Sequence, residues 1–229
     1  MPKHSLKDGA ETFDITVLEA PEPSRVVLFA VGGGGDPGRH LPLLLYLAAC
    51  GCTVVAPHCE RLMSASVSEG DLLSRARRLR LALDAFALPG LLVAGVGHSI
   101  GTTMLLALAG GQAWMRAGQC LPIATDSRLG KLALMAPATG YFQAPGALDG
   151  VAAPILAWAG SHDTITPPTQ AQFLEQSLGT RVPVEVRVVQ GAGHFSFMNH
   201  PPPNTADSLP NREALLTELA REICQFVRE

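Results

Sequence analysis

Ser99 lies within Gly97-His98-Ser99-Ile100-Gly101, a G-x-S-x-G pattern in which a serine can act as a nucleophile. An apolar run at 91–96 predicts a buried strand before it, and another at 102–109 predicts a buried helix after it. A sharp turn between strand and helix holds such a serine outward, and it needs flanking glycines because a Cβ would clash there. This context favours a nucleophile elbow over a small-residue turn with a solvated serine.

Two further residues can activate Ser99, because a serine hydroxyl is a weak nucleophile at neutral pH and needs a neighbouring base. His194, in Gly191-Ala192-Gly193-His194, can take the serine proton and later return it to the leaving group. Asp163, in a loop after an apolar run, can fix the tautomer of His194 and stabilise the imidazolium. The three residues together predict nucleophilic catalysis of acyl transfer.

The glycine run Gly32-Gly33-Gly34-Gly35 precedes Asp36-Pro37-Gly38 and admits two functional interpretations. In the first, an N–H of Gly33 or Gly34 joins the N–H of Ile100 to hold a tetrahedral oxyanion. In the second, G-x-G-x-x-G cradles a dinucleotide pyrophosphate, which needs an acid at the end of the following strand. Glu60 lies later than that position. The spacing therefore favours the oxyanion interpretation, with a plain flexible turn as a further alternative.

The other titratable residues are predicted to have no catalytic role. We expect His98 to pack within the elbow and His162 to be a loop residue on the wrong side of Asp163 for a proton relay. Asp126 is a reserve acid, disfavoured because it precedes a strand rather than following one. The remaining histidines are expected to line the mouth of the site or to be solvated: His40, His58 and His200.

Alternating helix and strand patterns must position these groups. Strands are predicted at residues 12–18, 25–31, 52–56, 91–96, 131–136, 154–160 and 182–188; helices at 40–49, 68–86, 102–109, 169–178 and from Asn211 onward. Inner strands are apolar throughout, while 12–18 and 182–188 alternate, which places those two near the edges. The pattern predicts an α/β fold: a doubly wound, mostly parallel sheet with helices on both faces. Ligands bind at the carboxyl ends of such strands.

The helix predicted at 68–86 begins with a capping box formed by Ser68 and Asp71. Its apolar positions recur at helical spacing, and an arginine cluster is expected to form a solvated face: Arg75, Arg77, Arg78 and Arg80. Trp114 and Trp158 are expected in or near the core.

Length and composition bound the function. The 229 residues predict one domain, 1–229, and 47% hydrophobic residues supply a large interior. A net charge of −3 without a long basic stretch argues against nucleic acid, and no apolar run reaches the ~18 residues of a membrane span. The start lacks the apolar core of a signal peptide, and five scattered cysteines suggest reduced thiols in the cytoplasm.

No metal or cofactor is predicted. Cys50-Gly51-Cys52 has one residue between its sulfurs and no second pair at zinc spacing. No two histidines lie four residues apart around a glutamate, as a zinc hydrolase helix requires.

The sequence resembles the α/β-hydrolase superfamily over nearly its whole length. The resemblance rests on the elbow, on the acid loop Gly160-Ser161-His162-Asp163-Thr164-Ile165-Thr166-Pro167 and on the histidine loop Gly191-Ala192-Gly193-His194-Phe195-Ser196-Phe197. The order serine, acid, histidine is that family's order. The compact form is most similar to dienelactone-hydrolase-like serine esterases. Dienelactone hydrolases proper carry a cysteine nucleophile where this chain has Ser99.

The resemblance also sets expectations for access to the site. Many family members have His-Gly before the oxyanion loop, where this chain has Val31-Gly32. Lids of this fold enter where this chain has only the short segment 137–153, so we expect little or no lid. The loop 198–210 is expected to form one wall.

The combined expectation is a serine hydrolase that cleaves a small-molecule carboxylic ester or thioester through an acyl-enzyme. Acyl transfer to another acceptor is an alternative within the class. The alternatives from other classes are a non-catalytic binding protein with this fold and a dinucleotide-binding oxidoreductase. The natural substrate and the oligomeric state are not predicted.

Overall fold

The computed structural model describes residues 3–63, 67–205 and 209–229. Within them, eight strands form one sheet: β1 (Lys3–Asp8), β2 (Glu11–Leu18), β3 (Arg25–Ala30), β4 (Cys52–Pro57), β5 (Val93–His98), β6 (Leu129–Met135), β7 (Ile155–Gly160) and β8 (Val184–Val189). The α-helices are α1 (Leu41–Ala49), α2 (Glu69–Phe86), α3 (Ile100–Leu108), α4 (Pro168–Leu178) and α5 (Arg212–Arg228). The alternation of strands and helices confirms the predicted fold class.

The strand order is β1-β2-β4-β3-β5-β6-β7-β8. All neighbours from β4 to β8 pair in parallel, while β2 runs antiparallel to both β1 and β4. The carboxyl ends of β3, β5, β7 and β8 therefore lie at one end of the sheet. The glycine run, Ser99, Asp163 and His194 follow those four ends.

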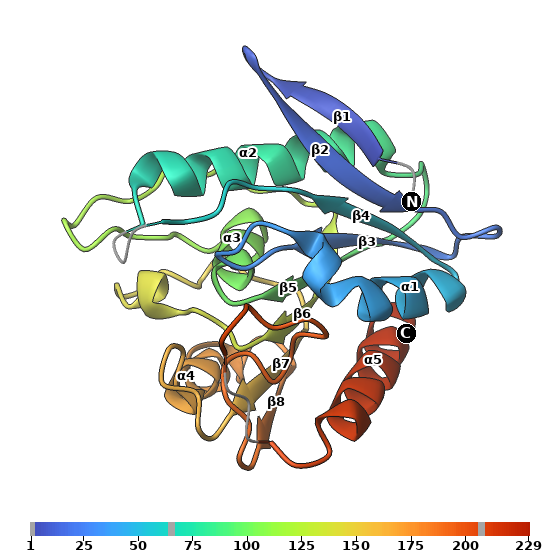
Figure 1. Ribbon diagram of the computed structural model, residues 1–229. Helices are drawn as coiled ribbons and strands as arrows, with labels where there is room; N and C mark the ends of the chain where they lie inside the picture. Colours follow the sequence, from blue (N-terminus) through green and yellow to red (C-terminus); the bar gives the residue numbers. More distant parts are fainter. Residues whose placement is uncertain (1–2, 64–66, 206–208) are drawn as a thin grey trace.

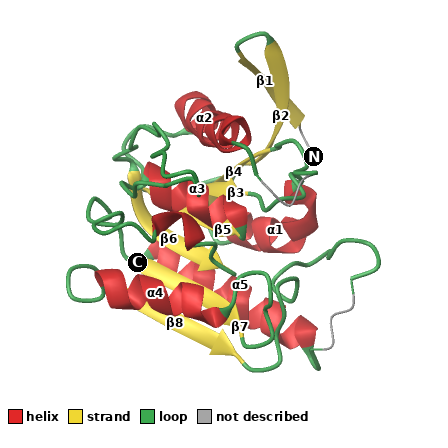
Figure 2. Cartoon of the chain, turned by 90° about the vertical axis from the view of Figure 1, so that its left-hand side faces the viewer, coloured by secondary structure: helices red, strands yellow, loops and turns green. Residues whose placement is uncertain are grey.

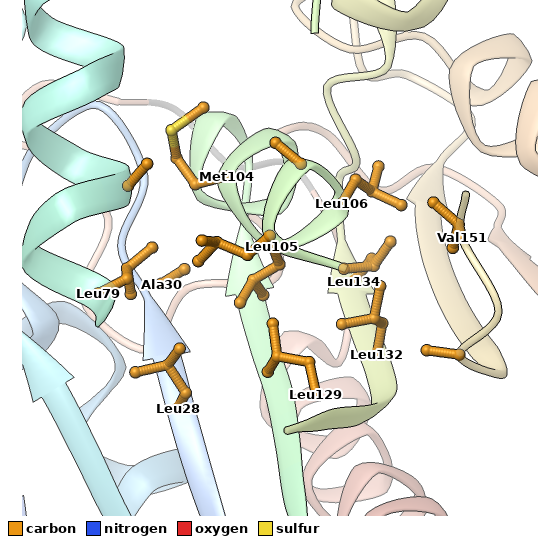
Figure 3. Packing of buried hydrophobic residues seen from close by; sticks show 14 of the residues in the cluster. Leu28, Ala30, Leu79, Met104, Leu105, Leu106, Leu129, Leu132, Leu134 and Val151 are labelled. Carbon is orange, nitrogen blue, oxygen red and sulfur yellow. The ribbon is translucent and has the colours of Figure 1, made fainter. Parts of the chain in front are cut away.

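Helices cover both faces of the sheet, as Figure 1 shows. On one face α2, α3 and α4 bury an apolar cluster that includes Leu79, Leu105 and Leu174, and on the other α1 and α5 bury a second that includes Leu44 and Ile223. Figure 3 shows α3 at the centre of the first cluster, where Leu105 faces side chains from the sheet and from α2. This two-sided burial explains why the inner strands are apolar at nearly every position.

Both strands that were expected near the edges of the sheet lie there, although a further strand, β1, forms one of the two edges. β8 lies at one edge and alternates between partly buried and exposed residues. The strand at 12–18 lies one place in from the other edge, because β1 pairs with it in a hairpin that lies beside α2 in Figure 2. Residues 3–8 carry few apolar side chains, so their pattern gave no strand signal; Gly9, with φ of 65°, makes the turn.

Some predicted boundaries were wrong by a few residues. β5 continues to His98 and α3 begins at Ile100, so the turn that holds Ser99 is a single residue long. The helix expected from 40 starts as a 3₁₀ turn, Pro37–His40, in which Gly38 N–H donates to the Asp36 carboxylate. Between β6 and β7 the structure has only a 3₁₀ turn, Gly140–Phe142, in keeping with the absence of a lid among the described residues.

The prediction of a solvated arginine face on α2 was wrong for two of its four members. Arg75 and Arg78 are 4% and 2% exposed, whereas Arg77 is exposed and Arg80 is half-buried. Arg75 follows the buried Leu72 by three residues, which places it on the core face of the helix. That spacing was the signal in the sequence.

The two cap predictions, for α2 and for α5, had different outcomes. Ser68 and Asp71 form the predicted capping box, with Asp71 N–H donating to Ser68 Oγ over 3.1 Å. Asn211 occupies the N-cap position of α5, but in a left-handed conformation without a side-chain capping bond.

The remaining expectations concern cysteines, tryptophans and membrane spans. The five cysteines are free thiols. Trp158 is buried and Trp114 packs against the core. No helix in the described ranges is long and apolar enough to cross a membrane.

Candidate active site

Ser99 stands on a strained turn between β5 and α3. Its φ of 54° and ψ of −128° are unusual for a residue with a side chain. The backbone is held there by Ser99 N–H, which donates to the Met135 carbonyl over 3.0 Å, and by Thr102, whose hydroxyl donates to the Ser99 carbonyl over 2.6 Å. The turn leaves the Ser99 side chain free to project from the carboxyl edge of the sheet.

Glycines let α3 approach the sheet closely enough to form this turn. A Cβ on Gly101 would overlap the carbonyl oxygen of Ala30 at the end of β3. A Cβ on Gly97 would lie 2.8 Å from Leu105 and 3.3 Å from the same carbonyl. The requirement for glycine on both sides of Ser99 is therefore a packing requirement, and it brings the elbow against the start of the glycine run.

The structure brings Ser99, His194 and Asp163 together in a hydrogen-bonded relay. Ser99 Oγ lies 2.9 Å from His194 Nε2, and His194 Nδ1 lies 2.8 Å from Asp163 Oδ2. The side chains of His194 and Asp163 are 6% and 0% exposed. Because a carboxylate only accepts, the ring proton lies on Nδ1, which leaves Nε2 to accept from the serine hydroxyl.

Asp163 is held as a carboxylate despite its burial. Burial alone would raise its pKa, but hydrogen bonds from His194 and Thr166 outweigh that effect and lower it. The backbone N–H groups of Ile165 and Thr166 each donate to Oδ1 over 2.8 Å, and the Thr166 hydroxyl lies 2.8 Å from Oδ2. Thr166 was not singled out from the sequence, although an aspartate side chain often accepts from the backbone N–H two residues on, as Asp163 does from Ile165.

Close backbone packing also joins the acid loop to the histidine loop. A Cβ on Gly160 would overlap the carbonyl oxygen of Ala192, and His162 N–H donates to that carbonyl over 2.9 Å. Gly193 N–H donates to the Ser196 hydroxyl over 2.9 Å. These contacts fix His194 relative to Asp163.

A stack of three histidine rings extends behind the relay. The rings of His40 and His98 lie 5.2 Å apart, and those of His98 and His194 lie 4.9 Å apart. Burial holds the pKa of His98 well below its ordinary value, so the ring is neutral and its Nε2–H donates to the His194 carbonyl over 3.0 Å. The packing role expected for His98 therefore includes a hydrogen bond to the backbone of His194.

His40 is buried, which overturns the expectation of a solvated residue, although it does line the cavity beside the relay. It is 1% exposed, and both ring nitrogens lack a hydrogen-bond partner among the described residues. Burial, aided by the charge of Arg39, lowers the pKa of His40 to about 3. Its place one residue before α1, behind the glycine run, could not be inferred from local sequence.

The glycine run faces the relay across a cavity of about 280 Å³. The lining residues are Gly32, Gly33, Gly34, Gly35, Asp36, Arg39, His40, Arg61, Leu62, His98, Ser99, Ile165, His194, Phe195, Met198, Pro202 and Pro203. The 198–210 loop thus contributes to one wall, although residues 206–208 of that prediction lie outside the described residues. A larger groove of about 420 Å³, between α2 and residues 122–124, contains none of the relay residues.

The remaining candidates face solvent or contact other residues. His162 is exposed, His200 is exposed, and His58 contacts the Thr16 hydroxyl over 3.0 Å. Asp126 forms an ion pair with Arg128 over 2.5 Å and caps the turn before β6. No group of three potential metal ligands occurs in the part of the chain that the structure describes.

Comparison with known proteins places this geometry in a recognised fold. No protein-family model and no curated protein matches the sequence. Among solved structures, an esterase from Thermogutta terrifontis with bound propionate is 15% identical, with a TM-score of 0.71 over 98% of this chain and 92% of that one.

Two further solved structures have the same architecture. An alpha-beta serine hydrolase homologue from Coxiella burnetii is 16% identical, with a TM-score of 0.68 over 97% of both chains. A putative alpha/beta hydrolase of unknown function from Agrobacterium tumefaciens is 17% identical, with a TM-score of 0.65 over 98% of this chain and 94% of that one. The chain has the α/β-hydrolase fold.

Proposed function

We propose that the chain is a serine hydrolase that cleaves small carboxylic esters or thioesters through an acyl-enzyme on Ser99. The observation that carries the proposal is the hydrogen-bonded relay from Ser99 Oγ through His194 to the buried carboxylate of Asp163. A relay of this geometry is the means by which an unactivated hydroxyl becomes a nucleophile.

In the first half-reaction, Ser99 Oγ attacks the ester carbonyl carbon while its proton passes to His194 Nε2. The tetrahedral oxyanion accepts hydrogen bonds from the N–H of Ile100, at the start of α3, and from Gly33 or Gly34. His194 then protonates the leaving alkoxide or thiolate as its bond to the carbonyl carbon breaks, which leaves the acyl group on Ser99. Asp163 keeps the His194 ring oriented and stabilises its protonated form.

In the second half-reaction, water attacks the acyl-enzyme, and His194 again takes and returns a proton. The acid is released and Ser99 regains its proton. Acyl transfer would use the same intermediate with another acceptor in place of water, so product analysis with an added alcohol or thiol distinguishes the two.

The cavity supports small substrates. A volume of about 280 Å³ accommodates a short acyl chain beside the scissile bond, and the walls include apolar side chains from Leu62, Ile165 and Phe195. We expect kcat/KM for p-nitrophenyl esters to be highest for short acyl chains and to fall beyond about six carbons, since each further methylene leaves the cavity. A steady rise with chain length up to palmitate would contradict the proposed pocket.

The structural neighbours are consistent with this chemistry. The esterase 2 of Thermogutta terrifontis is described with propionate bound and, separately, as phosphorylated by paraoxon. Its fold is the one seen here, and its name supports an ester as the substrate class. We also retain a cytoplasmic location as part of the proposal, supported by five free thiols.

The first test is intact mass after exposure to a fluorophosphonate. We expect one adduct on the wild type and none on Ser99→Ala, because only an activated serine attacks phosphorus at an appreciable rate. Ser24→Ala is the matched control, since its exposed hydroxyl lies at the opposite end of the sheet and donates to Gly51. A folded wild type without an adduct, and without turnover on a panel of short esters and thioesters, would refute the proposal and direct attention to non-catalytic binding or to dinucleotides.

A further inference from the structure

Arg75, on α2, is a buried cation that bonds to backbone carbonyls. Nη1 donates to the carbonyls of Gly32 over 3.1 Å and Val31 over 3.3 Å, and Nη2 donates to Glu60 over 2.6 Å and Gly33 over 3.5 Å. Among the described residues, no carboxylate forms a salt bridge with it. Arg75 is 4% exposed, and a guanidinium is costly to bury without such a partner, so its carbonyl contacts compensate that cost.

These contacts determine which way the glycine run presents its N–H groups. The structure has no cis peptide bonds among the described residues, and in a trans peptide the C=O and the following N–H point in opposite directions. With the carbonyls of Gly32 and Gly33 turned toward Arg75, the N–H groups of Gly33 and Gly34 point to the other side of the loop. The glycine run lines the cavity and Arg75 does not, so that other side is the cavity of Ser99 and His194.

The same two N–H groups are uncommitted. In the described chain, Gly33 N–H and Gly34 N–H donate to no other group, whereas Gly35 N–H donates to the Gly32 carbonyl over 3.1 Å. Leu62 N–H donates to the Gly33 carbonyl over 2.8 Å. The loop is thus anchored through its carbonyls, and its two central donors remain available to a ligand in the cavity.

A run of glycines has no side chains of its own to fix its conformation, and glycine loses the most freedom on ordering. The anchor from Arg75 opposes that freedom at three consecutive carbonyls. It also carries a charge: a cation bound to a carbonyl polarises the peptide and strengthens its N–H as a donor. The arrangement therefore positions and strengthens the donors.

We propose that Arg75 is a positioning residue for the reaction, one that orients the N–H groups of Gly33 and Gly34 toward the oxyanion and strengthens them through the peptide planes. This inference rests on the proposed ester hydrolysis. Arg75 does not touch the substrate; it acts through the loop. The oxyanion forms only as the transition state is approached. Replacing Arg75 should therefore lower kcat and leave KM nearly unchanged.

The test compares Arg75→Met and Arg75→Lys with the wild type on a short p-nitrophenyl ester. We expect kcat to fall about 100-fold in Arg75→Met with KM within about threefold, the loss seen when one oxyanion donor is removed. Arg75→Lys should lose about tenfold, since an ammonium keeps the charge but not the planar set of contacts. A folded Arg75→Met with wild-type kcat overturns the proposal; if that variant does not fold, wild-type kcat in Arg75→Lys overturns it.

Arg78→Met is the matched control. Arg78 lies on the same helix and is equally buried, but it binds the carboxylates of Asp8, Glu11 and Glu60 rather than the carbonyls of the glycine run. We expect Arg78→Met to lower Tm and to keep kcat within about twofold below its melting range. An equal loss of kcat in both variants would assign the effect to the stability of α2 and overturn the proposal.

A second readout does not depend on turnover. Hydrogen exchange at the amide of Gly35, which bonds to the Gly32 carbonyl, should accelerate in Arg75→Met and not in Arg78→Met. If the wild type neither hydrolyses esters nor reacts with a fluorophosphonate, the proposed function fails, and exchange still decides whether Arg75 orders the loop. Unchanged exchange at Gly35 in Arg75→Met would overturn that part.

Discussion

The relay depends on individual side chains whose roles differ in kind. His194 exchanges a proton with Ser99, whereas Asp163 touches only His194 and neighbouring donors in the acid loop. Thr166 and His98 in turn fix Asp163 and the His194 backbone. Substitution of the residue that transfers the proton should therefore lower kcat more than substitution of a residue that only orients it.

We predict that His194→Ala lowers kcat by about 10⁶-fold and Asp163→Asn by about 10⁴-fold. The smaller loss is expected because Asp163→Asn keeps His194 as the base, although the asparagine amide favours the wrong tautomer of the His194 ring. His162→Ala, an exposed histidine beside Asp163, should leave kcat unchanged. Steady-state kinetics on one short ester checks all three. Wild-type activity in Asp163→Asn would remove Asp163 from the relay.

His40 predicts a pH dependence of stability. Its pKa is about 3 in the folded protein and 6.5 when unperturbed, so below pH 6.5 the unfolded chain binds a proton that the folded one excludes. Stability is therefore lost as pH falls from 6.5 toward 3, by about 2 kcal/mol from this residue at pH 5. Urea unfolding at pH 7 and pH 5 measures this effect. The decrease in the free energy of unfolding between the two pH values should be about 2 kcal/mol smaller in His40→Phe than in the wild type.

The control for that measurement is His162→Phe, whose exposed ring should leave the pH dependence of the wild type intact. Identical pH dependence in His40→Phe and the wild type would mean that His40 is protonated in the folded protein as easily as in the unfolded one.

Among the elements, α3 and β3 are joined by a contact that only glycine allows. A Cβ at Gly101 would overlap the Ala30 carbonyl, so the first turn of α3 would have to move away from the strand. Ile100 N–H and Ser99 lie in that turn. Gly101 is therefore required both for the turn at Ser99 and for the position of the Ile100 N–H beside it.

We predict that Gly101→Ala costs at least about 3 kcal/mol of stability, in the upper range for overpacking, because the clash is with backbone rather than with a flexible side chain. It should also lower kcat. Gly140→Ala is the control, since nothing lies within 4 Å of a Cβ there. Urea unfolding and kinetics measure the two effects, and near-wild-type stability in Gly101→Ala would mean that α3 can shift without cost.

The whole molecule assembles the site from distant segments of the chain. Ser99 and His194 are 95 residues apart, and they meet because parallel strands deliver their following loops to one edge. The hairpin of β1 and β2 extends the sheet at the far side from β8 and is tied to α2 by Arg77 and Arg78.

Breaking that tie should affect stability more than activity. We predict that Arg78→Met costs about 3 kcal/mol, because Asp8, with its side chain 4% exposed, loses a buried partner while Arg77 remains. Arg181→Met, which removes an exposed pair with Asp149, should cost under about 1 kcal/mol. Urea unfolding compares the two; equal costs would mean that Asp8 needs only Arg77.

Local sequence was sufficient to predict the order of strands and helices from β2 onward, the elbow and the three residues of the relay. Apolar periodicity reports burial, and glycine beside Ser99 reports a tight turn, and both signals lie within a few residues of the feature they specify. The expectation that 25–31 and 91–96 form buried strands followed from their continuous apolar runs alone, although β5 begins only at Val93 and Leu92 is exposed. The catalytic roles of the relay residues remain predictions.

Tertiary structure alone decided the features that depend on contacts between distant segments. Arg75 bonds to Val31 across 44 residues, His98 bonds to His194 across 96, and β1 lies at the sheet edge because β2 offers it a partner. The spacing of Arg75 from Leu72 indicates the core face of α2, but the carbonyls that compensate its burial belong to a loop whose path the helix does not encode. The direction of each N–H in the glycine run likewise depends on residues outside the run that bond to its carbonyls, because glycine itself favours no single backbone conformation.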